Sequence, residues 1–383
     1  MLTLEIEFRQ LFKHGEEICG DRVEIAGNDG NRIVVMSDGL GSGVKANILS
    51  SLTTKIISTM LLEGCSIHDV AETLQQTLPV CKVRGVAYST FTALRIDDQG
   101  SVEAAEYDNP KLIWISNRKL RGLPRKEVEH GGRMKVLESS FKLKEDDWLV
   151  IISDGVVHAG IGRTWDLGWT WDRVAAYIKN FLTPATTSAE LTEEVVKLCA
   201  KLYVDQPGDD TTIVAMHYRK KNTLTFMIGP PRNADLDETV VRRFLESTGK
   251  KIACGGTTGN LLARHLGKEI EVNLDSGANG IPPIGILEGV DLLTEGVLTL
   301  AGVVELLRKN ASFSDLKYRS DGASRIVREI RMADDVHILL GQAINPAHQS
   351  PNTPVHLGLK FHLVEELQYL LGARGKHVTV EKF

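Results

Sequence analysis

The feature that most constrains the fold is a change of hydrophobic pattern near residues 219–223. Before this point strand-like runs outnumber helical ones, and the helical stretches come in pairs, which favours antiparallel sheets packed between helices. Beyond it strands and helices alternate, which is typical of a mainly parallel sheet with helices on its faces. With 383 residues the chain is long for one domain. We therefore predict an α+β domain over residues 1–219 and an α/β domain over residues 223–383.

The hydrophobic period assigns the individual elements. In the first part we predict strands at residues 3–11, 32–37, 88–96, 101–107, 111–117, 147–153 and 211–218, and helices at 43–62, 67–78, 171–181 and 188–202. In the second part we predict strands at 223–228, 251–254, 336–340 and 377–381, and helices at 237–248, 259–266, 299–309, 322–332 and 362–373. The segments 275–283 and 346–354 are rich in turn residues and are predicted to be loops.

Composition excludes several classes of protein. The net charge is −5 and the pI is near 6.2, whereas nonspecific nucleic-acid binding needs a basic surface. The five cysteines have no CxxC spacing, so neither a disulfide framework nor a zinc site is expected. The first residues carry charges throughout and do not resemble a signal peptide, and no apolar run approaches the ~20 residues of a membrane span. We expect a cytoplasmic protein with no nucleic-acid or membrane partner; the sequence does not indicate its oligomeric state.

Four short acidic segments carry the candidate chemistry. Asp38 and Asp154 each follow a run of apolar strand residues and precede a glycine. An aspartate that ends a buried strand is costly unless it is paired, hydrogen-bonded or bound to a cation. Two such strand endings therefore indicate two halves of one site, and hard divalent ions prefer carboxylate oxygens. The four segments are residues 19–21 (CGD), 37–43 (SDGLGSG), 153–156 (SDGV) and 208–212 (GDDTT).

A single Asp-Gly pair has a simpler explanation, because this dipeptide is common in tight turns. Four acidic segments in this arrangement make coincidence a poor account. Their order and wide separation resemble the protein phosphatase 2C family of metal-dependent phosphatases. The resemblance covers about residues 1–218 and is greatest to the bacterial branch that contains sporulation stage II protein E and the stress-response phosphatases. It implies an α-β-β-α sandwich in the first domain, and Asn109-Pro110 resembles a turn of that branch.

The resemblance also implies a site with two Mn²⁺ or Mg²⁺ ions. Asp38 would bridge both ions, while Asp21 and the backbone carbonyl of Gly39 would bind the second and Asp154 and Asp209 the first. A water between the ions would attack phosphorus in line, since two such metals activate the water and clamp the attacking and departing oxygens. Asp38 and Asp154 are accordingly the residues we expect to be catalytically essential.

The sequence departs from the family pattern at several positions. Leu40 stands where many eukaryotic members carry a histidine general acid, and residues 84–90 lack the carboxylate that helps to bind a third metal. Protonation of the leaving group would then come from water or from His158. Arg22 is a candidate phosphate contact, with an exposed strand arginine as the alternative. Asp210 is the weaker choice of ligand in its Asp-Asp pair.

Two further features are candidate binding elements. The segment after Asp154 holds three tryptophans within seven residues. Trp165 and Trp169 could either contact substrate or pack this segment onto the rest of the domain. In the second domain, Gly255, Gly256, Thr257 and Thr258 lie between a strand and a helix. They could form an anion-binding loop, with a tight strand–helix turn as the alternative.

These observations predict a bacterial signalling enzyme that removes phosphate from serine or threonine on a partner protein. By resemblance, the partner would be similar to an anti-sigma-factor antagonist. Two alternatives remain open: a non-catalytic phosphatase fold that acts as scaffold or sensor, and a small-molecule phosphoesterase. The role of residues 223–383, regulatory or ligand-binding, follows only from their position behind the catalytic domain.

Overall fold

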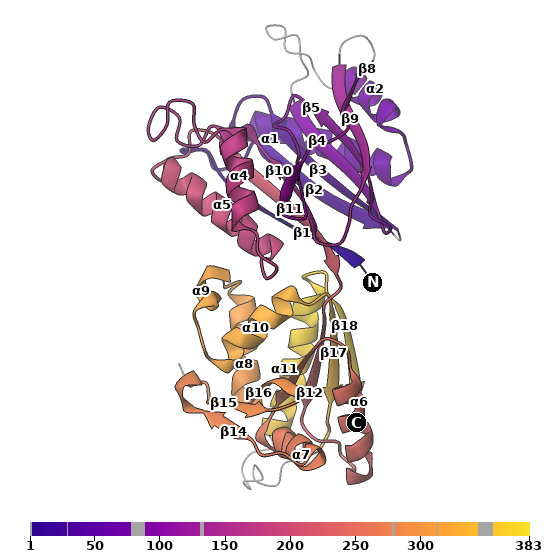
Figure 1. Cartoon of the computed structure of the whole chain (residues 1–383), viewed down its shortest axis with the longest axis vertical. Coiled ribbons are helices and arrows are strands. Elements are labelled where there is room, and N and C mark those ends of the chain that lie inside the picture. The colour runs from indigo at the N-terminus through magenta and orange to yellow at the C-terminus, as the bar shows by residue number, and fades with distance from the viewer. Residues whose placement is uncertain are drawn as a thin grey trace. The chain divides into compact units, whose positions relative to one another are not determined.

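The computed structural model describes residues 2–28, 30–77, 89–130, 134–277, 280–311, 313–343 and 355–383. The chain divides into two compact units, Met1–Lys220 and Lys221–Phe383, each of which is described by itself (Figure 1). The predicted loop at 346–354 and most of the 84–90 segment lie outside the described residues.

The first unit contains two antiparallel sheets. One has the strand order β2-β3-β4-β5-β9-β8 and the other β1-β11-β10-β6-β7. The strands are β1 (Leu2–Leu11), β2 (Asp21–Asn28), β3 (Asn31–Gly39), β4 (Ser89–Asp97), β5 (Ser101–Tyr107), β6 (Ile113–Ser116), β7 (Lys119–Arg121), β8 (Lys126–His130), β9 (Met134–Lys142), β10 (Asp147–Ile152) and β11 (Thr211–Lys220). The helices are α1 (Gly43–Leu62), α2 (Ile67–Thr77), α3 (Asp154–Val157), α4 (Trp171–Phe181) and α5 (Ser188–Leu202).

Alternation along the strands builds the layers of this unit. In β3, Val34 and Met36 face the other sheet, where they share a core with Ile151 of β10 and other residues, while Ile33 and Val35 face α1 and α2. A third cluster fills the space between the outer face of the five-stranded sheet and helices α4 and α5. Because central strands bury both faces, they are apolar almost throughout. The order of layers is helix, sheet, sheet, helix.

The second unit is built on one mixed, mostly parallel sheet of seven strands with the order β14-β15-β16-β13-β12-β17-β18. Strands β12, β13, β16, β17 and β18 are parallel, and β14 and β15 join antiparallel at one edge. The strands are β12 (Thr223–Ile228), β13 (Lys250–Cys254), β14 (Glu271–Asn273), β15 (Ile284–Leu287), β16 (Val290–Thr294), β17 (Asp335–Leu340) and β18 (His377–Lys382).

Helices cover both faces of this sheet. The α-helices are α6 (Asp237–Glu246), α7 (Gly256–Leu266), α8 (Val297–Arg308), α9 (Phe313–Lys317), α10 (Gly322–Met332) and α11 (Val355–Gly372), and the 3₁₀ turns are η1 (Ala234–Leu236) and η2 (Leu274–Ser276). Helices α8, α10 and α11 pack on one face and α6 and α7 on the other. Two helices begin three or more residues before their predicted starts: α7 begins at Gly256 rather than 259, and α11 at Val355 rather than 362. Both helices begin with small or weakly periodic residues, which the hydrophobic period does not detect.

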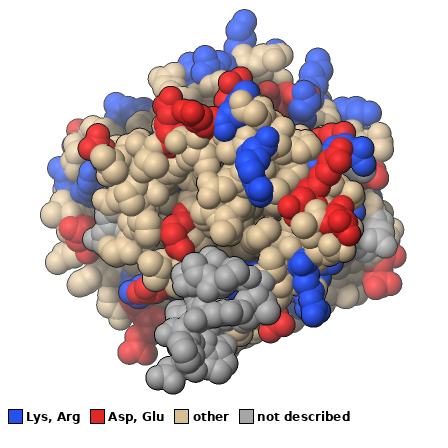
Figure 2. All heavy atoms as spheres, turned by 90° about the horizontal axis from the view of Figure 1, so that it is seen from below, with Lys and Arg blue, Asp and Glu red and all other residues tan. Residues whose placement is uncertain are grey.

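The surface and helix lengths bear on possible partners. Among the described residues, no helix combines the length and apolar character needed to cross a membrane. Figure 2 shows one face of the molecule, where described Lys, Arg, Asp and Glu side chains are interspersed around broad uncharged areas. On the described part of that face, neither sign forms a continuous field.

Candidate metal centre

Two aspartates meet at the end of the six-stranded sheet. Asp21 is the first residue of β2 and lies directly opposite Asp38 near the end of β3. Side chains alternate between faces along a strand, so both aspartates share the face of Val23 and Met36, which look into the layer between the sheets. The strand pairing therefore brings together two of the four predicted acidic segments.

The other two segments come from the five-stranded sheet. Asp154 is the first residue of α3, two residues after the end of β10, and Asp209 lies two residues before the start of β11. Strands β10 and β11 are neighbours, so both residues lie at the same edge. The two sheets are joined there because the Thr212 hydroxyl donates a 2.6 Å hydrogen bond to Oδ2 of Asp21. All four acidic segments thus gather where the ends of the two sheets meet.

Asp209 and Asp210 play different parts. Oδ1 of Asp210 accepts a 3.0 Å hydrogen bond from the backbone N–H of Lys13, and Oδ2 accepts one of 2.8 Å from that of Gly20. Asp210 is buried, so it fastens the segment between β1 and β2 to the start of β11. The Asp209 side chain is 40% exposed; its Oδ1 accepts a 3.0 Å hydrogen bond from the backbone N–H of Asp210 and lies 3.9 Å from Lys13 Nζ, and its Oδ2 has no hydrogen-bond partner among the described residues. This arrangement leaves the first acid of the pair available to a ligand and uses the second for structure.

The glycines after the strand aspartates are required by close approach. A Cβ atom added at Gly39 would lie 2.0 Å from the carbonyl oxygen of Ala46 in α1. One added at Gly155 would lie 2.0 Å from the carbonyl oxygen of Asp210. Real Cβ contacts are never this short, so no other residue fits without moving the backbone. The Asp-Gly pairs therefore dock α1 and α3 against the site rather than merely forming turns.

The crowding of carboxyl groups is visible in their pKa values. The pKa of Asp38 is raised to about 9, by burial first and then by the neighbouring carboxylates of Asp21, Asp154, Asp209 and Asp210. Burial raises the pKa of Asp21 to about 7, although hydrogen bonds from Thr212 and Ser153 oppose the shift. The pKa of Asp209 is also raised, by burial and then by Asp154. A group of acids that suppress each other's ionisation is one that a bound cation would stabilise in the charged form.

The residues fit divalent ions by chemistry. Oδ1 of Asp21 is buried and has no hydrogen-bond partner, which is costly for a carboxylate unless something binds it. The available donors are carboxylate and carbonyl oxygens, the ligands that Mg²⁺ and Mn²⁺ prefer. As the described side chains stand, no three His, Cys, Asp or Glu residues converge closely enough to hold a metal ion. The oxygen atoms suited to bind a metal therefore lie in one region, but the described side chains do not converge on a single point there.

Sequence reasoning missed the polar residues that organise this edge. Nε2 of Gln10 donates to the Asp21 backbone carbonyl and to the Thr212 hydroxyl, both at 3.1 Å. The Ser153 hydroxyl accepts from the backbone N–H of Thr212 at 2.8 Å. Thr212 and Ser153 stand inside the acidic motifs, so their hydroxyls were visible in the sequence. Gln10 could be placed only by the pairing of β1 with β11.

The weaker candidates around the site fall in different places. Arg22 is exposed, and by strand alternation it faces away from Asp21. Trp165 is half-buried, with the Arg173 guanidinium 5.2 Å from its ring centroid. Trp169 is buried in the core behind α4, where it meets Tyr177 edge-on, so its packing role is evident. His158, on the next turn after Asp154, places Nδ1 3.9 Å from Asp154 Oδ2.

The predicted anion loop of the second unit is mostly helix. Only Gly255, with φ of +115°, precedes α7, while Gly256, Thr257 and Thr258 form its first turn. The Thr258 hydroxyl is buried; it donates to the carbonyl of Cys254 and accepts from the backbone N–H of Gly229. These bonds tie the ends of β12 and β13 to α7, which is the work of a tight strand–helix turn.

The chain is similar to a known protein family. Residues 28–219 match the family model described as stage II sporulation protein E, SpoIIE, which is just over half of the chain. The chain belongs to the SpoIIE family. Its SpoIIE-type domain is a phosphatase 2C domain of the bacterial branch, which confirms the resemblance seen in the acidic motifs. No curated protein matches the chain.

Solved structures similar to this SpoIIE-family chain include two from Bacillus subtilis. The SpoIIE phosphatase domain is 18% identical with a TM-score of 0.46, covering 57% of this chain and 93% of that one. A SpoIIE phosphatase domain with a fragment of its regulatory domain is 19% identical with a TM-score of 0.49, covering 57% and 62%. RsbX in complex with magnesium is 20% identical with a TM-score of 0.41, covering 57% and 100%.

Proposed function

We propose that the first unit hydrolyses phosphoserine or phosphothreonine on a partner protein and requires Mn²⁺ or Mg²⁺. The observation that carries the proposal is the convergence of four acidic segments from two sheets, in a chain of the SpoIIE family. The partner would be a phosphorylated signalling protein similar to an anti-sigma-factor antagonist. The enzyme would act in bacterial cytoplasm.

Each proposed ligand has a distinct support. Asp38 would lie between two ions. Besides burial, its pKa is raised by each of the other aspartates of the acidic cluster, which are Asp21, Asp154, Asp209 and Asp210. Asp21 and the Gly39 carbonyl would hold one ion, and the unpartnered Oδ1 of Asp21 is the atom left for it. Asp154 and Asp209 would hold the other, and their side chains are 42% and 40% exposed at the open side of the cluster.

When bound, such ions supply activation of water and neutralisation of charge on the phosphoryl group. The side chains of the protein hold the aspartates in position and favour their ionised form. Thr212 and Ser153 stabilise the ionised form of Asp21, and Gln10 holds the Asp21 backbone. His158 is positioned beside Asp154, where its imidazole could donate a proton to a departing oxygen. The close contacts at Gly39 and Gly155 fix the backbone on which two of the aspartates stand.

The test is metal-dependent turnover of a generic aryl phosphate and of a phosphoprotein. With Mn²⁺ the full chain should hydrolyse both substrates, and Asp38→Asn or Asp154→Asn should lower kcat by at least ~10³-fold, as expected for loss of the metal's contribution. Asp98→Asn, in an exposed turn of the same unit, is the matched control and should retain activity.

Three outcomes would contradict the proposal. Absence of turnover with any divalent ion would favour the scaffold or sensor. Hydrolysis of free phosphoserine but not of phosphoproteins would favour a small-molecule phosphoesterase. Equal loss of activity in Asp98→Asn and Asp38→Asn would indicate a general effect of removing surface charge.

A further inference from the structure

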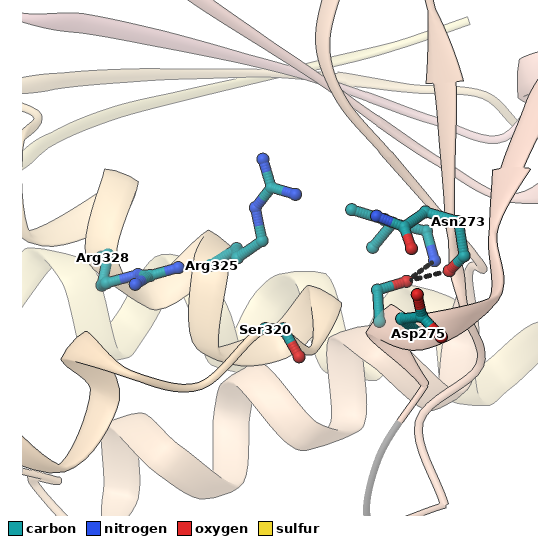
Figure 3. A pocket seen from close by; sticks show the side chains of 7 residues that line it. Asn273, Asp275, Ser320, Arg325 and Arg328 are labelled. Atoms are coloured by element: carbon teal, nitrogen blue, oxygen red, sulfur yellow. Dashed lines mark hydrogen bonds between the residues drawn. The ribbon is translucent and has the colours of Figure 1, made fainter.

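A polar cavity in the second unit is not used by the proposed phosphatase chemistry. It has a volume of about 370 Å³ and is lined by Asn273, Asp275, Ser276, Ile284, Ser320, Arg325 and Arg328. Figure 3 shows Arg325 and Arg328 on one wall, both from α10, and Asn273 and Asp275 on the facing wall. Ligand cavities of ~300–1,000 Å³ accommodate small molecules, so this one suits a metabolite at the lower end of that range.

The arginine wall has an unsatisfied charge. Arg325 is half-buried, and in the described part of the chain its guanidinium makes no hydrogen bond or ion pair. Arg328 uses one nitrogen, Nη1, which donates to the carbonyl of Lys317 at 2.7 Å. A guanidinium that is partly removed from water and has no partner is costly, and its forked donors match carboxylate or phosphate oxygens.

The facing wall is firmly built and carries the opposite charge. The Ser276 hydroxyl donates to the carbonyl of Asn273 and accepts from the backbone N–H of Ile284 at 2.8 Å, which pins η2 to β15. Asp275 is exposed and has no hydrogen-bond or ion-pair partner among the described residues. Its carboxylate is left to accept a hydrogen bond from a group inside the cavity.

The charges define the ligand. Two guanidinium groups and one carboxylate give the lining a net charge of +1, so an anion is favoured overall. A donor on the same ligand would satisfy Asp275. We propose that this cavity binds a small organic anion, a carboxylate or a phosphate monoester, that also bears a hydroxyl or amino group. Arg325 and Arg328 hold the anionic group, and Asp275 and Asn273 hold the donor.

The proposal is tested by calorimetric titration of the full chain in chelator, which keeps divalent ions from the acidic cluster. The probes are two matched pairs, D-glycerate with propionate and glycerol 3-phosphate with propyl phosphate. At least one hydroxylated probe should bind saturably at one site, and more tightly than its partner. The pair that binds identifies the anion as carboxylate or phosphate.

Variants assign the binding to this cavity. Arg325→Gln should weaken binding at least ~10-fold, as for loss of a charge-assisted hydrogen-bond pair. Arg242→Gln, an exposed arginine on α6, is the matched control and should bind normally. Asp275→Asn should reduce the preference for the hydroxylated probe. If Arg325→Gln does not fold, as judged by circular dichroism, Arg325→Lys should still weaken binding because it lacks the forked geometry.

The proposal is overturned if none of the four probes binds saturably up to ~10 mM, which is weaker than small-molecule recognition requires. It is equally overturned if Arg325→Gln and Arg242→Gln have the same effect. The readout is binding rather than turnover, so the result does not depend on the phosphatase proposal.

Discussion

At the scale of single residues, two adjacent and identical side chains do different work. Asp210 is buried, and both of its carboxylate oxygens accept hydrogen bonds from backbone N–H groups. Asp209 is partly exposed. Asp210 is 4% exposed, whereas the Asp209 side chain is 40% exposed, so only one of the two points into the fold. A substitution at Asp210 should therefore affect mainly stability, and a substitution at Asp209 should affect mainly metal binding.

Asp210→Ala should lower the free energy of unfolding by ~1–3 kcal/mol, because it leaves the buried N–H of Gly20 and the partly buried N–H of Lys13 without an acceptor. Asp209→Ala should change it by less than ~0.5 kcal/mol, as expected at a partly exposed position, yet should abolish Mn²⁺-dependent turnover. Urea unfolding of metal-free protein measures the first effect and aryl phosphate hydrolysis the second. A larger loss of stability in Asp209→Ala would reverse the assignment.

The raised carboxyl pKa values predict a pH dependence of stability. The pKa values of Asp21 and Asp38 rise from 3.8 to about 7 and about 9 in the folded chain, mainly through burial. The folded state therefore keeps protons that the unfolded state releases. The stability contributed by protonation is complete below about pH 4. It is lost as the pH rises through the folded pKa values, first for Asp21 and then for Asp38.

Metal-free protein should accordingly show a falling Tm between about pH 5 and about pH 9. Asp38→Asn should flatten this slope and raise stability at pH 8 by ~1–2 kcal/mol, as is common when a strained site is neutralised. At pH 8, Mn²⁺ should raise the Tm of the wild-type protein and should have little effect on the Tm of Asp38→Asn. Thermal unfolding in chelator, with and without Mn²⁺, measures both. A Tm of the metal-free protein that rises over this range would contradict burial of the two carboxyl groups as the origin of their raised pKa values.

At the scale of secondary-structure elements, two glycines allow α1 and α3 to make close backbone contacts beside the aspartates. The carbonyl oxygen of Ala46 in α1 occupies the space where any side chain at Gly39 would start. Since Asp38 immediately precedes this contact, the position of α1 and the position of the carboxylate are set together. The same holds for α3, whose Gly155 meets the backbone of Asp210.

Gly39→Ala should cost ~1–3 kcal/mol or more, because the added methyl group forces the β3–α1 contact apart. It should also lower turnover by displacing Asp38. Gly122→Ala is the control, since a Cβ there meets no atom within 4 Å and the residue has no positive φ. Chemical denaturation and activity assays of both variants test this. Near-identical stabilities of the two would show that the strand and helix can separate freely.

Elements with a strong period could be predicted from the sequence. The bounds of α4 and α5 agree with residues 171–181 and 188–202, because their apolar faces recur regularly. The bounds of α1 agree with residues 43–62, although its buried face is largely small and polar and includes Ser50, Thr53 and Ser58. Strand β2 was missed, since half of its residues face outward and are charged or small. Strands β7, β8, β9 and β16 were also missed, as was the antiparallel pair β14 and β15, which glycine and proline surround. Short elements of this kind form through pairing with neighbours, which a local pattern does not contain.

The acidic cluster was predicted in part. Family motifs located Asp21, Asp38, Asp154 and Asp209, and strand pairing brings their segments to one place. The structural work of Asp210 and Gln10 could not be predicted, because it depends on contacts across about 190 residues or more of chain. The cavity of the second unit likewise joins β14, β15 and α10, and no sequence motif marks it.

At the scale of the whole molecule, the two units have separate cores. Strand β11 ends at Lys220 and β12 begins at Thr223. Lys221 and Asn222 bond to Asp335 and Asp334, so the connection belongs to the second unit. Each unit therefore has its own buried clusters and its own complete sheets.

Expressed alone, residues 1–220 and 221–383 should each fold cooperatively, because no sheet is cut between them. The first fragment should retain Mn²⁺-dependent hydrolysis of aryl phosphate, and the second should retain the anion binding proposed for its cavity. Circular dichroism, thermal unfolding and titration measure these properties. A first fragment that stays unfolded would show that the second unit is needed for its stability.

The pairing of β1 with β11 also has a consequence for biosynthesis. Leu2 through Leu11 find their only described strand neighbour at Thr211 through Lys220, the last strand of the same unit. On the ribosome, the amino-terminal strand must wait until about residue 220 has emerged before its edge of the sheet can form. Asp209 and Asp210 arrive with that strand, so the acidic cluster is completed only when the whole first unit has been made.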